Sequence, residues 1–328
     1  MKCINKWICL SLLAAVLCVN GCGKTSFAIE QPYDVYATAA DFGLSSNGTA
    51  EAKSYFASDL CVSEDVAIGT DSTDSQVAEG AGTFNLETNT VVYAKNLYER
   101  LYPASTTKIL TAYIALKYCD DLDAMVTVSE NAVNQASDSS VCNLKAGDVI
   151  RLRDLLYGLM LRSGNDAAVA IAEYISGDVD SFAALMNQEA AAMGATRSHF
   201  VNPNGLPDEN HYTCVYDMYL IFSNAVKNDT FVSIIGTTSY DVTYTDASGA
   251  AVTHTWENTN QYLTGNATTP DGFQIVGGKT GTTGEAGYCL VLYSYNPSGQ
   301  PIISIVFKAD GKSNLYLLMN EMLQGFAI

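Results

Sequence analysis

The distribution of apolar and polar residues divides the chain of 328 residues into three parts. A start with two lysines precedes an apolar run over residues 7–19, which is too short to span a bilayer and is typical of an export signal. Residues 29–57 are polar, rich in Ser, Thr, Ala and Asp, and show little periodicity. This pattern predicts a signal peptide over residues 1–21, a flexible tether over 22–57 and one folded domain over 58–328.

Within the domain, the spacing of apolar residues changes along the chain. Short apolar or β-branched runs over residues 82–86 and 91–94 flank a polar tetrapeptide, a pattern typical of a β-hairpin. A longer apolar stretch after Pro103 predicts a buried helix over residues 106–118. Residues 119 to about 230 are expected to be mainly helical, with helix-period apolar residues over 154–161, 166–175 and 182–193.

After about residue 237 the pattern changes to that of strands. The predicted strands cover residues 240–245, 274–276, 288–295 and 302–307, and a final helix is expected over 314–323. Asn296-Pro-Ser-Gly299 is a turn by composition. A sheet interrupted by a run of helices predicts an α+β fold: an antiparallel sheet flanked by helices, with an inserted, mainly helical lobe over about residues 105–235.

Two signals for processing the leader compete. Val19-Asn-Gly-Cys22 resembles a bacterial lipobox, in which Cys22 becomes the lipidated first residue of the mature protein. Ser26-Phe-Ala28 has small residues where an ordinary signal peptidase requires them, so cleavage after Ala28 is the alternative. We favour Cys22 because it follows the apolar run closely. Both alternatives predict an extracytoplasmic protein, either lipid-anchored to the outer face of the cytoplasmic membrane or secreted.

The composition argues against several classes of function. A formal net charge of −18 repels nucleic acid, so no nucleic-acid partner is expected. The three histidines (His199, His211 and His254) are scattered without ligand spacing, and we expect neither a metal site nor a cofactor. The five cysteines beyond Cys22 contain no Cys-x-x-Cys pair. We expect buried free thiols, and a single disulfide is the alternative.

Three short motifs occur in a fixed order: Ser105-Thr-Thr-Lys108, Ser163-Gly-Asn165 and Lys279-Thr-Gly281. Each motif alone is weak evidence. A lone Ser at a helix start is usually an N-cap, and a Lys three residues later is usually a solvated charge. Their joint occurrence, each in the structural context that it needs, indicates an active-site serine hydrolase.

These residue types supply the parts of acyl-transfer chemistry. Ser105 is expected at a helix start with a free backbone N–H, and Lys108 on the same side of the helix can take its proton. Lys108 acts as a base only if burial and a second cation, here Lys279, lower its pKa. Ser163 can relay a proton towards the leaving nitrogen, and Asn165 can hold both Lys108 and a substrate amide.

The third motif predicts a substrate-binding strand beside the nucleophile. Lys279, Thr280 and Thr282 combine a cation with hydroxyl groups, which suits a carboxylate. The missing side chain of Gly281 lets a substrate lie against the backbone. The backbone N–H groups of Thr282 and Ser105 would together form an oxyanion hole.

The motifs are those of the penicillin-recognising serine hydrolases, and their flanking residues resemble the low-molecular-weight penicillin-binding proteins of D-alanyl-D-alanine carboxypeptidase type. The resemblance runs from about Asp59 to the C-terminus, and rests on Pro103–Lys108, Ser163–Ala167, His199–Leu206, Gly278–Thr282 and Ala286–Tyr288. It implies a β-lactamase/transpeptidase-like fold. It also implies removal of the terminal D-alanine from peptidoglycan stem pentapeptides through an acyl-enzyme on Ser105, and covalent inhibition by β-lactam antibiotics.

Other functions fit part of the pattern. A D,D-endopeptidase, which cuts peptidoglycan cross-links, shares these motifs and stays open as the alternative. A class A β-lactamase needs a deacylating Glu in a Glu-x-x-Leu-Asn stretch, which is absent between Asn165 and Lys279. A non-catalytic β-lactam sensor needs a membrane-spanning segment, and the sequence has no second apolar span. Many relatives have a C-terminal β-rich domain and an amphipathic anchor. This chain ends one helix after its last predicted strand, so we expect any membrane anchor at the N-terminus.

Overall fold

The structure, a computed structural model, describes residues 57–328. The predicted signal peptide, the predicted lipidation site at Cys22 and all but the last residue of the predicted tether lie outside the described residues.

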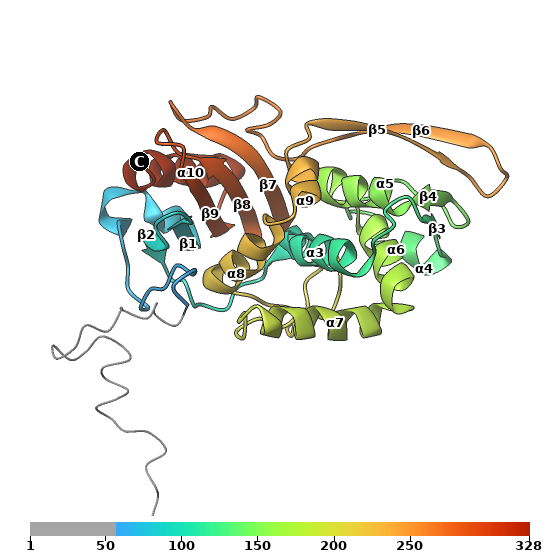
Figure 1. The fold of residues 1–328 in the computed structure, drawn as a ribbon, viewed down its shortest axis with the longest axis horizontal. Helices are drawn as coiled ribbons and strands as arrows, with labels where there is room; N and C mark the ends of the chain where they lie inside the picture. Colours follow the sequence, from blue (N-terminus) through green and yellow to red (C-terminus); the bar gives the residue numbers. More distant parts are fainter. Residues whose placement is uncertain (1–56) are drawn as a thin grey trace, which may run out of the picture. The chain divides into compact units, whose positions relative to one another are not determined.

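The main sheet has five antiparallel strands in the order β2-β1-β9-β8-β7 (Figure 1). The strands are β1 (Ala78–Asn85), β2 (Thr90–Lys95), β7 (Gln274–Thr283), β8 (Gly287–Tyr295) and β9 (Pro301–Ala309). The predicted hairpin is confirmed as β1 and β2, and the predicted turn joins β8 to β9. Strand β7 is longer than the predicted 274–276, so the whole third motif lies on the edge strand of this sheet.

Successive side chains of a strand point to opposite faces of the sheet. In the main sheet, apolar clusters cover both faces. On β8, Leu290 and Leu292 belong to the apolar cluster formed with helix α10 (Lys312–Phe326). Val291 and Tyr293 belong to the larger cluster on the opposite face, which includes helices α3 (Lys108–Tyr118) and α8 (Val215–Ala225). The C-terminal helix predicted over 314–323 is therefore confirmed, and it seals one face of the sheet.

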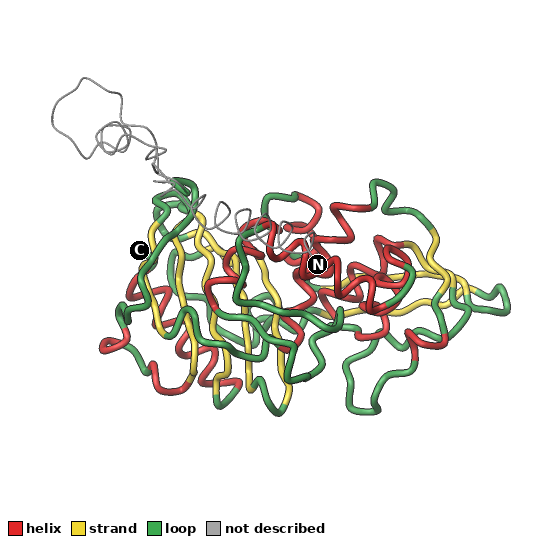
Figure 2. Tube along the Cα trace, turned by 90° about the horizontal axis from the view of Figure 1, so that it is seen from below, coloured by secondary structure: helices red, strands yellow, loops and turns green. Residues whose placement is uncertain are grey.

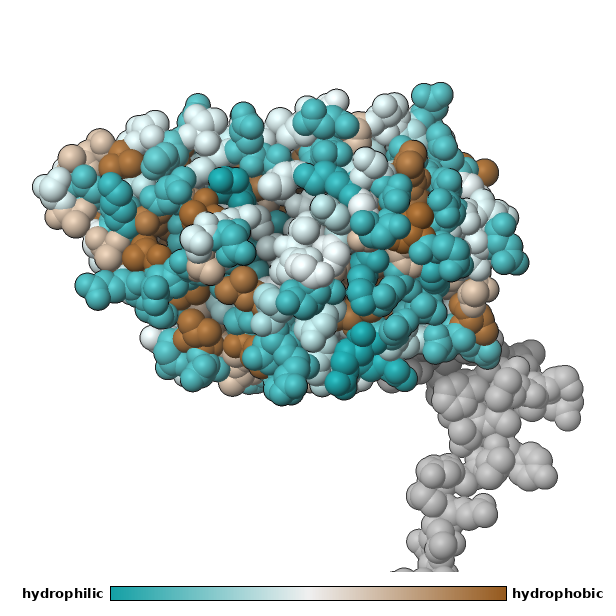
Figure 3. All heavy atoms as spheres, turned by 180° about the vertical axis from the view of Figure 1, so that it is seen from behind, coloured by the Kyte–Doolittle hydropathy of each residue, from teal (hydrophilic) through white to brown (hydrophobic). Residues whose placement is uncertain are grey.

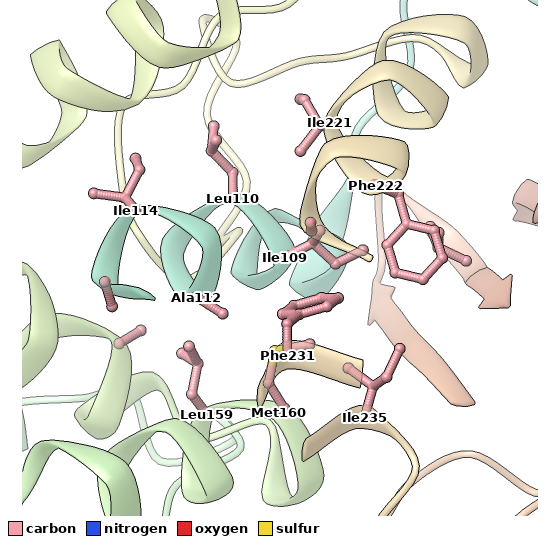
Figure 4. Packing of buried hydrophobic residues seen from close by; sticks show 14 of the residues in the cluster. Ile109, Leu110, Ala112, Ile114, Leu159, Met160, Ile221, Phe222, Phe231 and Ile235 are labelled. Atoms are coloured by element: carbon pink, nitrogen blue, oxygen red, sulfur yellow. The ribbon is translucent and has the colours of Figure 1, made fainter. Parts of the chain in front are cut away.

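Helix α3 (Lys108–Tyr118) lies at the centre of the larger cluster. Figure 4 shows its apolar residues pointing in several directions, towards Phe222 of α8, Phe231 of α9 (Asp229–Ile235) and Leu159. A helix that is apolar on all sides is buried on all sides. Among the buried residues of α3, only Lys108 carries an ionisable amine. The fold thus places the predicted base inside the core.

Besides α3 and α10, residues 57–328 form six α-helices, and the last four of these contact α3. They are α4 (Glu130–Val133), α5 (Leu152–Tyr157), α6 (Asn165–Ser176), α7 (Val179–Ala192), α8 (Val215–Ala225) and α9 (Asp229–Ile235). The helices predicted over 166–175 and 182–193 are confirmed as α6 and α7. The helix predicted over 154–161 begins earlier, at Leu152, and continues after Tyr157 as a π-helical turn over Gly158–Arg162.

A second sheet is also present, and the sequence interpretation missed it: two of its strands lie within the region predicted as mainly helical, and two follow that region. Its order is β3-β4-β5-β6, from β3 (Met125–Thr127), β4 (Val149–Arg151), β5 (Ser239–Thr245) and β6 (Ala251–Glu257). Figure 2 shows these strands apart from the main sheet, with helical segments between them. The strand predicted over 240–245 is real, but it pairs with β4 and β6 and not with the main sheet.

Polar residues cover most of the face in Figure 3, and apolar residues appear there in separate small groups. Most large apolar side chains are buried in the two clusters. None of the helices in residues 57–328 has the length and apolar character needed to span a bilayer.

Candidate active site

The nucleophile candidate lies on a tight turn in front of α3. Ser105 belongs to a 3₁₀-helix, Ala104–Thr107, that runs directly into α3, so it stands at a helix start as predicted. Ala104 has a φ of 47°, in the left-handed region that non-glycine residues rarely adopt. A Cβ on Gly205 would lie 1.8 Å from the Ala104 carbonyl oxygen, so only glycine fits behind the turn. The strained turn is therefore held by a closely packed neighbouring loop.

Lys108 points from α3 back to the Ser105 hydroxyl. Its Nζ donates to Ser105 Oγ at 2.9 Å, to Asn165 Oδ1 at 2.8 Å and to the Asn204 carbonyl oxygen at 2.7 Å. The side chain is fully buried. Burial, and then the nearby charge of Lys279, lower the pKa of Lys108 well below its usual value of 10.5. This shift favours the neutral amine, whose lone pair lies within reach of the Ser105 proton.

The second motif owes its position to the π-helical turn after α5. Ser163 closes that turn with a φ of 61°, and α6 begins two residues later at Asn165. The Asn165 backbone N–H donates to the Ser140 carbonyl oxygen at 2.8 Å, which joins this motif to the loop before β4. The extra residue of a π-helical turn changes the direction of the chain. Here it turns Ser163 and Asn165 towards α3.

Lys279 belongs to β7, is buried, and lies next to Ser163. Its Nζ donates to Ser163 Oγ at 3.0 Å and to the Thr280 carbonyl oxygen at 2.9 Å. Burial lowers the pKa of Lys279 from 10.5 to about 7. The two lysines and the two serines therefore form two neighbouring pairs, Lys108 with Ser105 and Lys279 with Ser163.

Gly281 brings β7 against the nucleophile turn. A Cβ at this position would lie 2.9 Å from the Ser105 backbone nitrogen, and 3.1 Å from both Ala104 Cβ and the Pro103 carbonyl oxygen. The absent side chain thus makes room for the protein's own turn. Because β7 is an edge strand, alternate backbone groups along it face away from β8. The strand can therefore present N–H groups beside Ser105.

Two cavities meet at Ser105. The first, about 410 Å³, lies between the loop at Ser139–Ser140, the segment Asn204–Pro207 and the end of β7 at Thr282–Glu285. The second, about 220 Å³, contains Thr280, Gly281 and Thr282 together with Thr259 and Lys312. Thr259 Oγ1 and Thr280 Oγ1 lie 2.6 Å apart. The second cavity therefore combines hydroxyl groups with an exposed ammonium group.

All eight residues predicted from the motifs lie around this centre, but the two buried lysines, Lys108 and Lys279, line neither cavity, whereas Lys312 lines the second. Lys312 begins α10 and is exposed. The sequence analysis missed it, together with Ser140, Asn204 and Thr259. Of these only Asn204 lay in a noted segment, His199–Leu206. The others lie in loops or at a helix end without a local signal.

His211 is a further buried residue that the sequence interpretation left without a role. Its Nδ1 accepts from the Val201 backbone N–H at 3.1 Å, so its Nε2 carries the proton and donates to Thr107 Oγ1 at 2.9 Å. Burial lowers the pKa of His211 to about 4, and it stays neutral at physiological pH. His211 therefore braces the nucleophile turn without adding charge beside Lys108.

Within residues 57–328, no group of three or more His, Cys, Asp and Glu side chains could hold a metal ion. The five cysteines there are free, as predicted; four are buried and Cys119 is partly exposed. An antiparallel sheet between helices, with a serine and a buried lysine at a helix start, defines a serine hydrolase of the acyl-transfer class.

A comparison with known protein families identifies the family within this class of hydrolases. The model of the D-alanyl-D-alanine carboxypeptidase family, peptidase family S11, matches residues 69–311. The D-alanyl-D-alanine carboxypeptidase of Streptomyces sp. K15 is 34% identical over 265 residues, covering 76% of this chain and 88% of that protein. The chain belongs to this family of penicillin-recognising serine peptidases.

Other relatives agree in sequence and in structure. DacF of Bacillus subtilis is 33% identical over 251 residues, which are 75% of this chain but only 61% of the Bacillus protein. The crystal structure of the Streptomyces K15 DD-transpeptidase matches with a TM-score of 0.69 at 33% identity, covering 77% of this chain and 98% of that one. DacD of Francisella tularensis matches with a TM-score of 0.67 at 28% identity, covering 81% and 72%. The predicted β-lactamase/transpeptidase-like α+β fold is confirmed.

Proposed function

We propose that this protein removes the terminal D-alanine from peptidoglycan stem pentapeptides through an acyl-enzyme on Ser105, and that β-lactam antibiotics acylate the same oxygen. The observation that carries the proposal is the fully buried Lys108 amine, 2.9 Å from Ser105 Oγ. A serine hydroxyl is a weak nucleophile until a base takes its proton. A lysine whose pKa is held well below its usual value can be that base at neutral pH.

In the acylation step, Ser105 Oγ attacks the carbonyl carbon of the scissile D-alanyl amide while Lys108 Nζ takes the proton. The carbonyl oxygen becomes an oxyanion between the backbone N–H groups of Ser105 and Thr282. One such donor contributes about 2.7–4 kcal/mol in other enzymes. The close approach of Gly281 to the Ser105 nitrogen supports this arrangement, because it brings the two backbones together.

Collapse of the intermediate breaks the amide bond, and the leaving nitrogen takes a proton. Ser163 is assigned to relay to that nitrogen the proton that Lys108 took from Ser105, so that Lys108 is neutral again, while Lys279 Nζ donates to Ser163 Oγ and orients the hydroxyl. In deacylation Lys108 accepts a proton from a water that attacks the ester. The products are the shortened peptide and free D-alanine, and Ser105 regains its proton.

The chemistry of the two cavities suggests how the substrate lies. The free carboxylate of the terminal D-alanine suits the smaller cavity, where Thr280 and Lys312 offer a hydroxyl and an exposed ammonium group. The preceding residues of the stem peptide then extend into the larger cavity along Thr282–Glu285 and past Asn165. Lys279 contacts Ser163 and lines neither cavity, so we assign it to Ser163 and not to direct binding of the carboxylate.

The proposal is tested with a synthetic pentapeptide ending in D-Ala-D-Ala and with a fluorescent penicillin. The wild type should release D-alanine and carry the label on the peptide that contains Ser105. Ser105→Ala should lose both signals, and Lys108→Ala nearly as completely, because nucleophile and base act as a unit. Ser298→Ala, in the remote turn between β8 and β9, is the matched control and should keep both. Full labelling of Ser105→Ala would overturn the assignment.

A second candidate is transfer of the acyl group to an amine. It is supported by the likeness to structures of the Streptomyces K15 DD-transpeptidase. Adding a peptide with a free amino group to the same assay separates the two: transfer gives a longer peptide, whereas hydrolysis gives the shortened acid. Cross-linked muropeptides as substrate test the D,D-endopeptidase alternative in the same experiment.

We further propose that the protein is held outside the cytoplasm by a lipid on Cys22. The support is the leader sequence, in which Gly21-Cys22 closely follows the apolar run over residues 7–19. A terminus with two or three acyl chains binds membranes firmly, where one chain is marginal. The native protein should fractionate with membranes, and Cys22→Ala should release it or leave the leader uncleaved. A mature N-terminus at Ile29 without lipid would instead mean ordinary secretion.

A further inference from the structure

A third polar cavity lies apart from the two that meet at Ser105. Its volume is about 260 Å³, and its walls are Tyr98, Arg100, Thr196, Arg197 and Tyr212. These residues come from three segments: the loop after β2, the turn after α7 and the segment before α8. Two antiparallel bridges, Leu101 to Thr213 and His199 to Tyr212, join the segments. The position of the two arginines therefore follows from the fold and not from local sequence.

Each guanidinium group is placed over a tyrosine ring. The Arg100 Cζ lies 3.7 Å from the centre of the Tyr212 ring, and the Arg197 Cζ lies 5.2 Å from the centre of the Tyr98 ring. Tyr98 is itself fixed, because its hydroxyl donates to the Ser63 carbonyl oxygen at 2.6 Å. When a planar guanidinium stacks on an aromatic ring, its N–H groups lie in the plane of the guanidinium and can still donate to a ligand there. Both arginines are thus oriented before any ligand arrives.

Neither arginine forms an ion pair, although the Asp217 carboxylate lies near Arg197 and accepts from its backbone N–H at 2.7 Å. The sequence contains 35 acidic residues and only five arginines. Arg151 and Arg153 each form an ion pair, with Asp154 and Asp123. Within residues 57–328, however, no carboxylate lies within 4.0 Å of the guanidinium of Arg100 or Arg197. In so acidic a protein, two guanidinium groups without an ion pair in one cavity are a local concentration of positive charge.

From this geometry we infer that the cavity binds a phosphate group. Two guanidinium groups supply paired N–H donors at fixed directions, which match the several oxygens and the negative charge of a phosphate. The Thr196 hydroxyl adds a neutral donor on the same wall. The negative surface elsewhere repels a polyanion, so a phosphate-bearing ligand is directed to this cavity. Two sources share this chemistry: a glycerol-phosphate polymer of the cell envelope and the headgroup of an anionic phospholipid.

The site is separate from the proposed catalytic centre. Neither Arg100 nor Arg197 lines the cavities that meet at Ser105. Substitutions here should therefore leave the turnover of a short pentapeptide unchanged. Because binding is measured directly, the inference stands or falls independently of the peptidase assignment.

The test is calorimetric titration of the purified full-length protein with inorganic phosphate, a glycerol-phosphate oligomer and monomeric short-chain phosphatidylglycerol. Wild type should bind phosphate, and Arg100→Ala or Arg197→Ala should weaken binding by about tenfold or more. Arg100→Lys keeps the charge but loses the stacked fork, and should fall between the two. Tighter binding of the oligomer or of the phospholipid identifies the source.

Arg153→Ala is the matched control, because it removes an exposed arginine that is already paired with Asp123. It should bind phosphate as wild type does. The inference is overturned if the wild type does not bind phosphate at low ionic strength. It is equally overturned if Arg153→Ala weakens binding as much as Arg197→Ala does, since binding would then reflect overall charge.

Discussion

Gly281→Ala is the sharpest test of how β7 and the nucleophile turn cooperate. The new Cβ would lie 2.9 Å from the Ser105 nitrogen and 3.1 Å from Ala104 Cβ, and ordinary contact begins at 3.4 Å. These neighbours are backbone or the first atom of a side chain, so they cannot turn aside. The strand must therefore move away from the turn by about 0.5 Å, the difference between 3.4 and 2.9 Å.

That displacement widens the proposed oxyanion hole between the Ser105 and Thr282 N–H groups. Full loss of one donor slows other enzymes by about 10²–10³-fold, and errors of about 1 Å cost about a hundredfold. We therefore expect acylation of Gly281→Ala to slow by between about tenfold and about a hundredfold. Overpacking should also lower the free energy of unfolding by about 1–3 kcal/mol.

The assay is the rate of labelling by a fluorescent penicillin, followed with D-alanine release, at a temperature where circular dichroism shows the variant folded. Gly325→Ala, near the end of α10, is the control, because a Cβ there meets nothing within 4 Å and Gly325 lines neither cavity at Ser105. It should react within about twofold of the wild type. Acylation of Gly281→Ala at the wild-type rate would refute the claim that this contact sets the oxyanion hole.

Two further predictions concern the lysines. If Lys312 holds the terminal carboxylate, Lys312→Ala should reduce the preference for a C-terminal acid over the matching amide by about tenfold, with Lys312→Arg close to wild type; equal ratios in all three proteins would exclude the role. Burial holds the pKa of Lys279 at about 7, below its usual 10.5, so between these pH values the unfolded chain binds more protons and stability rises with pH. The gain in melting temperature from Lys279→Met should accordingly be largest near pH 7 and shrink towards pH 10, and a gain independent of pH would contradict the buried, depressed amine.

The local elements were largely predictable, because their signals are local. The β1–β2 hairpin has a polar turn between two apolar runs, and α3 follows a proline with a long apolar stretch. Helices α6 and α7 both end near glycines, Gly177 and Gly194, as a helix C-terminus requires. In each of these elements the residues that decide the conformation lie within a few positions of one another.

The second sheet was not predictable in this way. Strands β3 and β4 have three residues each, too few to show an alternation of apolar and polar positions. They exist because they pair with each other, and β4 pairs with β5 from a distant part of the chain. Residues 119–151 were accordingly interpreted as part of a helical region. The stabilisation of such short strands comes from pairing and not from propensity.

By itself, the sequence determined the order of the motifs, the class of chemistry and the family, since these depend on residue types at short, fixed spacings. The tertiary structure alone decided what those residues face. It placed Lys279 behind Ser163 and Lys312 on the cavity wall, 33 residues further along the chain. It also set Gly281 against the Ser105 turn. The physical reason is that burial and proximity shift pKa values and position charges, and both arise only when distant segments pack together.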